Sequence, residues 1–217
     1  MNDMDAATDE NRPPASPAES LRLIQEQRAH AERSLTPDPR FIYWPWSFAW
    51  LVGFGLFFLK YGSDGDGLVA MPAWLPFVTL YALMAVALVV MTMALFRAGR
   101  QVAGESATKG TMFGVSWALG FVMLAVINGY LTDYLPPAQI GLLWAASSIG
   151  LVAVLYAAGA AIWYDRIMFL LGCWLGLINI AGVLAGPGWH ALIISIAGGG
   201  GGLVLGYVAW RNLARRR

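Results

Sequence analysis

Four small polar residues interrupt long apolar stretches of the chain and are the residues best suited to bind a solute: Ser147, Ser148, Asn179 and Ser195. Hydroxyl and amide groups donate and accept hydrogen bonds without carrying a net charge, so such a set suits a neutral solute. Two interpretations are open. The side chains could line a small polar cavity, or they could hydrogen-bond one helix to the next, at about 0.6–2 kcal/mol per contact in a membrane. We favour the second interpretation.

The other residues that could act in catalysis or bind a metal do not assemble into a catalytic set. His30 precedes the apolar region and His190 is expected at the opposite membrane edge, where the last span begins, so the two fall on opposite sides of a membrane and cannot share a metal ion or a haem. Cys173 lies in an apolar stretch, where its thiol should be unreactive. The turn 62–67 carries two aspartates but lacks the closing Glu of a calcium loop. We expect no catalytic residue, no cofactor and no metal, and we predict that the protein is not an enzyme.

Long stretches without charged residues indicate the helices that position these side chains. The chain is 58% hydrophobic and 12% charged, against about 25% charged residues in soluble domains. A membrane-spanning helix needs about 20 apolar residues. Five stretches contain no Asp, Glu, Lys or Arg: Phe41–Leu59, Gly67–Phe96, Gly110–Thr132, Tyr134–Tyr164 and Ile167–Trp210. We therefore predict an all-α protein embedded in the lipid bilayer.

The last charge-free stretch is too long to cross a bilayer once, and Gly186-Pro187-Gly188 divides it into two spans. The prediction is a bundle of six transmembrane helices. Their expected bounds are about 41–59, 72–96, 111–131, 138–163, 167–185 and 189–210.

The basic residues predict how the bundle is oriented. Summed over alternate loops, 13 of the 14 Lys and Arg fall on the side of the N-terminus, and Lys60 alone falls on the other side. Cytoplasmic loops carry the excess of Lys and Arg, so both termini are expected inside the cell, in a plasma membrane of bacterial type. The net charge of +1 gives no electrostatic case for binding nucleic acid.

The segments that flank the bundle are polar. Residues 1–14 predict a disordered tail. Ser16-Pro17-Ala18-Glu19 has the residue pattern that starts a helix, which predicts a cytoplasmic amphipathic helix over 15–36. This helix could lie on the membrane or on the protein itself, or it could bind a protein partner. Residues 211–217 are expected to form a basic cytoplasmic tail.

Small residues at four-residue spacing predict close helix packing. Gly198, Gly202 and Gly206 share one face of the sixth span, and Gly172 and Gly176 share one face of the fifth. We expect the fourth to sixth spans to form a tightly packed subdomain, with a homo-oligomer seam or a bound ligand as alternatives. The run of five glycines from 198 to 202 could also bend or unwind the sixth helix, although a bilayer favours an intact one.

Three N-terminal segments carry a resemblance to a known group of proteins. Glu19–Arg28, Pro37–Arg40 and Trp44-Pro45-Trp46 resemble the start of small bacterial polytopic membrane proteins, which are uncharacterised and loosely labelled as transporters. The resemblance covers about the first 50 residues. It adds to the expectation of a transport-related role and implies no activity or site residue.

Two classes of function follow from these patterns. The first is a non-catalytic integral membrane protein, transport-associated or an accessory subunit of a membrane complex. The second is a small permease or channel for a neutral solute. No charged residue lies inside a predicted span, which argues against proton relays built on carboxylates and against voltage sensors. A membrane enzyme is the class that the residues favour least.

Overall fold

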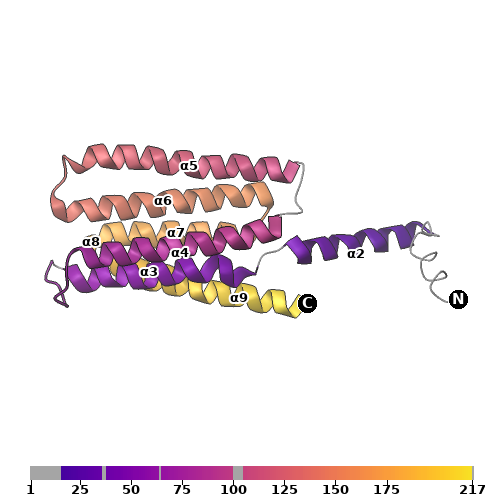
Figure 1. The fold of residues 1–217 in the computed structure, drawn as a ribbon, viewed down its shortest axis with the longest axis horizontal. Coiled ribbons are helices and arrows are strands. Elements are labelled where there is room, and N and C mark those ends of the chain that lie inside the picture. Colours follow the sequence, from indigo (N-terminus) through magenta and orange to yellow (C-terminus); the bar gives the residue numbers. More distant parts are fainter. Residues whose placement is uncertain (1–15, 36–37, 64, 100–104, 217) are drawn as a thin grey trace.

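The computed structural model describes residues 16–35, 38–63, 65–99 and 105–216 (Figure 1). The predicted tail over residues 1–14 lies outside this part of the chain. All secondary structure within it is helical. The helices are α2 (Pro17–Leu35), α3 (Pro39–Tyr61), α4 (Trp74–Gly99), α5 (Glu105–Thr132), α6 (Pro137–Trp163), α7 (Arg166–Ala185), α8 (Pro187–Ile193), the π-helix η1 (Ile194–Gly200) and α9 (Gly201–Arg216).

Six helical segments are long and apolar enough to cross a membrane. Five of them are α3 to α7, and the sixth is the continuous run of α8, η1 and α9. The predicted fold class, a bundle of six membrane-spanning helices, is confirmed, and the protein is a multi-pass integral membrane protein.

The helices begin at residues that satisfy free backbone N–H groups. Asp38 precedes α3 and accepts a hydrogen bond from the backbone nitrogen of Arg40 at 2.9 Å. Asp165 precedes α7 and accepts from the backbone nitrogens of Ile167 and Met168. These caps satisfy donors that a helix start leaves free. Gly186, at φ 101°, provides the left-handed turn between α7 and α8.

Two helices extend further than the apolar pattern predicts. Helix α5 begins at Glu105 instead of about residue 111, and α9 runs to Arg216, so most of the expected basic tail is helical. Backbone hydrogen bonding continues past the point where apolar residues end, because a helix needs no apolar side chains once it leaves the bilayer.

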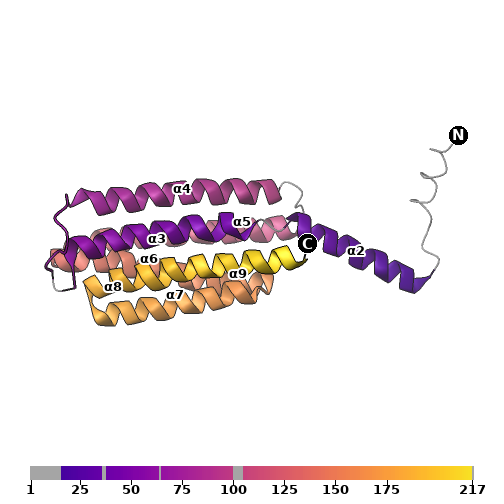
Figure 2. The ribbon, with the colours of Figure 1, turned by 90° about the horizontal axis from the view of Figure 1, so that it is seen from below.

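The helices pack as an open series. Helix α5 lies at one edge and packs on α6, α6 packs on α7, and α7 packs on the sixth span (Figures 1 and 2). The sixth span packs on α3, and α4 covers the outside of α3. Among the described residues, α4 and α5 do not touch, although they follow one another in sequence.

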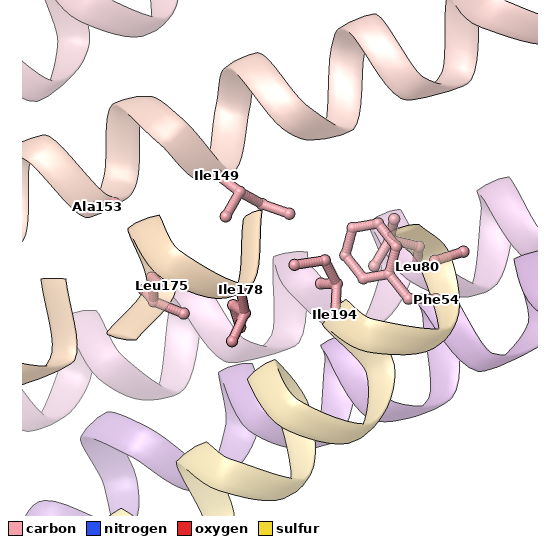
Figure 3. Packing of buried hydrophobic residues seen from close by; sticks show 8 residues of the cluster. Phe54, Leu80, Ile149, Ala153, Leu175, Ile178 and Ile194 are labelled. Carbon is pink, nitrogen blue, oxygen red and sulfur yellow. The ribbon is translucent and has the colours of Figure 1, made fainter. Parts of the chain in front are cut away.

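Five of the six spans form the buried core. Its side chains come from α3, α4, α6, α7 and the sixth span, as Figure 3 shows. The core residues are Phe54, Leu80, Ile149, Ala153, Leu175, Ile178, Ala191 and Ile194. Helix α5 contributes no residue to this core.

Both described ends of the chain lie at the same end of the bundle (Figures 1 and 2). The ends of α4, α6 and α9 and the starts of α3, α5 and α7 lie there too, so Arg97, Lys109, Arg166 and Arg211 share this end. Lys60 lies in the last turn of α3, at the opposite end. The basic residues are therefore separated in space as the loop count predicts, and the cytoplasmic location of this end stays a prediction. Helix α2 extends away from this end and does not lie across it.

The fourth and fifth spans pack through glycine, as expected. A Cβ atom added at Gly172 would lie 2.7 Å from the backbone oxygen of Ala153 and 2.7 Å from the backbone nitrogen of Ala157. Only a residue without a side chain fits there. Gly176 is less crowded, with the Ala153 Cβ at 3.9 Å.

The glycine face of the sixth span packs on a helix that the sequence did not indicate. The expected partners were the fourth and fifth spans, but this face lies against α3, the first span. A Cβ atom added at Gly198 would lie 3.2 Å from the ring of Trp50, and one added at Gly206 would lie 2.7 Å from the ring of Trp44. A Cβ atom added at Gly202 would meet the hydroxyl of Ser47. Residue spacing identifies the close-packing face of a helix, but it carries no information on which helix covers that face.

The glycine run neither breaks the sixth helix nor leaves it regular. Residues Ile194–Gly200 form a π-helix, which joins α8 to α9 without a gap. The indole nitrogen of Trp174 in α7 donates to the backbone oxygen of Ala197 in this segment at 3.0 Å. The bend or unwinding that the sequence left open therefore takes the form of a change in helix type.

Candidate functional site

A buried histidine–asparagine pair joins α7 to α8 near the end of the bundle opposite the termini. His190 Nε2 lies 2.9 Å from Asn179 Oδ1. The two residues are 1% and 8% exposed. Asn179 precedes the end of α7 by six residues, or about 9 Å of helix, so the pair lies well inside the membrane-spanning region.

Local sequence explains how the pair forms. The Gly186 turn folds α8 back along α7, which brings residue 190 opposite residue 182. Gly182 makes room for the imidazole, because a Cβ atom there would lie 2.7 Å from His190 Cδ2. Asn179 is one helical turn from Gly182 on α7, so its amide reaches Nε2, the ring atom next to Cδ2.

The hydrogen bonds of Asn179 determine which imidazole nitrogen carries the proton. Asn179 Nδ2 donates to the backbone oxygen of Ala146 in α6 at 2.9 Å. Its Oδ1 atom therefore faces His190 and accepts a hydrogen bond, since Oδ1 has no proton to donate. The neutral imidazole consequently carries its proton on Nε2. One amide thus links α6, α7 and α8.

The predicted serines do not join this pair. Ser147 Oγ accepts a hydrogen bond from Asn128 Nδ2 at 2.7 Å, which ties α5 to α6. Ser195 Oγ donates to the backbone oxygen of Leu51 at 2.7 Å, which ties the π-helix to α3. Ser148 is half-buried, and no side-chain hydrogen bond joins it to the other three within the part of the chain that the structure describes.

Three of the four predicted polar residues therefore make hydrogen bonds between helices, and each of the three joins a different set of helices. This arrangement agrees with the interpretation that these residues hydrogen-bond one helix to the next. A solute cavity lined by the four residues stays a prediction. No buried side-chain nitrogen or oxygen in the described residues lacks a hydrogen-bond partner.

Sequence reasoning missed the role of His190, which it placed at the membrane edge. The structure places the ring inside the bundle, because α8 begins at Pro187 and has turned back into the membrane by residue 190. A signal was present: Gly182 and His190 are each four residues from Gly186, the centre of the turn. In a helical hairpin, positions equidistant from the turn face one another.

The pair has the chemistry of a neutral hydrogen-bonding site. In the described ranges, no three His, Cys, Asp or Glu residues gather as metal ligands would. Cys173 is exposed on α7. No family model matches the chain, and no curated protein or solved structure matches it. The resemblance of the N-terminal segment therefore stays a prediction.

Proposed function

We propose that the protein is a non-catalytic accessory subunit of a membrane complex and that it docks on another integral membrane protein through α5. The observation that carries this proposal is the position of α5. This 28-residue helix packs on α6 and on no other described helix, and it lies at the edge of the bundle (Figure 1).

The exposed face of α5 has the composition of a helix-packing surface. Small residues recur on it at spacings of three, four and, once, seven residues, and all of them are exposed: Ala107, Thr111, Gly114, Ala118, Ala125 and Gly129. Added Cβ atoms at Gly114 and Gly129 would meet nothing within 4 Å. Small residues let two helix backbones approach closely in lipid, where burial of apolar surface drives no association.

Helix α2 supports the same role outside the membrane. It extends from the bundle, and Leu21, Leu23 and Ile24 are exposed on it. Exposed apolar residues on a helix that packs little against its own bundle suit binding to a partner. The association with transport rests on the resemblance of the N-terminal segment alone.

The test replaces glycines on α5 that nothing within the bundle contacts. Gly114→Leu and Gly129→Leu should leave the fold intact and abolish a larger complex on native electrophoresis of membranes from the source cell. Gly141→Leu is the matched control, because Gly141 is exposed on α6 and also meets nothing within 4 Å. A complex that survives both α5 variants, or that Gly141→Leu also disrupts, contradicts the proposal. If two differently tagged copies are recovered together instead of a second protein, α5 is a homo-oligomer seam.

A second candidate, a small permease for a neutral solute, is favoured by one observation, the buried pair of Asn179 and His190. Polar groups inside a membrane protein often mark the path of a substrate. The purified protein would then move a neutral solute across liposomes, and Asn179→Leu would stop this flux. Solute movement equal to that of protein-free liposomes contradicts this candidate.

A further inference from the structure

Two arginines on α9 face solvent one helical turn apart. Arg211 and Arg215 are both exposed, and neither has an ion-pair partner among the residues that the structure describes. Like charges four residues apart on a helix repel one another. An anion bound between them would remove this repulsion.

A third guanidinium, at the start of α3, contacts the residue that precedes this pair in α9. Arg40 lies over the ring of Trp210, 4.9 Å from its centroid, and Trp210 precedes Arg211 in α9. Arg40 also forms an ion pair with Asp38 at 2.7 Å. Asp38 thus offsets the charge of Arg40, and no ion pair joins it to Arg211 or Arg215 within the described residues.

Aromatic side chains place this cluster at the depth of lipid headgroups. Tyr207 and Trp210 lie next to each other on α9, with ring centroids 5.9 Å apart. Trp44 of α3 packs at Gly206 and donates its indole N–H to the backbone oxygen of Leu203 at 3.2 Å. Trp and Tyr gather where hydrocarbon meets headgroups, and the arginines follow directly on the polar side.

We propose that Arg211 and Arg215, with Tyr207 and Trp210 beneath them, bind the phosphate of an anionic phospholipid such as phosphatidylglycerol. Guanidinium groups bind phosphate oxygens through paired hydrogen bonds. The aromatic rings lie where the glycerol and the first part of the acyl chains would pass. This site does not depend on whether α5 docks a partner.

Native mass spectrometry of the delipidated full-length protein tests the proposal. We expect phosphatidylglycerol to bind more tightly than phosphatidylcholine, and more weakly as salt is raised. The double variant Arg211→Gln/Arg215→Gln should bind phosphatidylglycerol about 30-fold more weakly, given about 1 kcal/mol per arginine near an anionic surface. Arg211→Lys/Arg215→Lys keeps both charges and should retain most of the binding, which separates charge loss from misfolding.

The matched control is Arg97→Gln/Arg166→Gln, which removes two exposed charges from the same end of the bundle but from other helices. It should leave binding nearly unchanged. An equal loss in both double variants would mean a diffuse positive field and would overturn the site. Equal binding of the two lipids would overturn it too. Displacement of the lipid by equimolar inorganic phosphate would show a site for a free anion and would refute the lipid assignment.

Discussion

Asn179 in α7 and His190 in α8 form a hydrogen bond of 2.9 Å between two nearly inaccessible side chains, and the same asparagine amide also holds the backbone of α6. Three segments of the membrane domain are thus joined through one side chain. In lipid, a polar group that loses its partner cannot turn to water for another.

The first prediction concerns this pair. Asn179→Leu removes the partner of the His190 N–H and of the Ala146 carbonyl, so the free energy of unfolding should fall by about 1–3 kcal/mol. Titration with sodium dodecyl sulfate measures it. A double-mutant cycle with His190→Leu should give a coupling of about 0.6–1.7 kcal/mol. Additive effects of the two substitutions would mean that the pair does not interact.

The second prediction concerns the seam between the sixth span and α3. A Cβ atom at Gly199 would lie 2.5 Å from the backbone nitrogen of Leu51. Gly199→Ala should therefore lower the free energy of unfolding by about 1–3 kcal/mol, because the helices must separate. The neighbouring Gly200 meets nothing within 4 Å, so Gly200→Ala should leave stability unchanged or raise it by up to about 1 kcal/mol. Equal losses would argue against the packing described.

The third prediction concerns the π-helix. Trp174→Phe keeps an aromatic ring in α7 but removes the donor to the Ala197 oxygen, and it should cost about 0.6–2 kcal/mol of stability in the same titration. Trp189→Phe is the control, because the indole nitrogen of Trp189 makes no hydrogen bond to any described residue. If both variants unfold alike, the hydrogen bond to Ala197 contributes nothing measurable.

The fourth prediction concerns orientation. Reporter domains fused at Asp133 and after Arg217 should report opposite compartments, with the C-terminal fusion inside the cell, because 13 of 14 basic residues fall on that side. Alkaline phosphatase and a fluorescent protein, active on opposite sides of a bacterial membrane, make the measurement. Both fusions active on one side would exclude six spans.

The number and type of helices could be predicted because each span must exclude charge, and the turn at Gly186-Pro187-Gly188 interrupts the only stretch that is too long. Helix ends were less predictable, since α5 and α9 continue into polar sequence. Spacing identified the glycine face of the sixth span, whereas its partner depends on how the six helices are arranged in three dimensions.

The candidate site was predicted only in part for the same reason. Asn179 stands out as a polar residue in an apolar stretch, so composition finds it. His190 lies only four residues past the turn, where sequence cannot distinguish a loop from a helix that has re-entered the membrane. Ser147 and Ser195 were found by residue type, but their separate partners, Asn128 and the Leu51 carbonyl, follow from packing.

The π-helix at Ile194–Gly200 sets the orientation of α9, which follows it. A π turn contains about one residue more than an α turn, so α9 is rotated by about 100° relative to a helix that continued in α form. That rotation turns Trp210 toward Arg40. Deletion of one residue in this segment would therefore allow a plain α-helix with α9 in its present orientation, whereas conversion to α form at the present length would turn Trp210 away from Arg40.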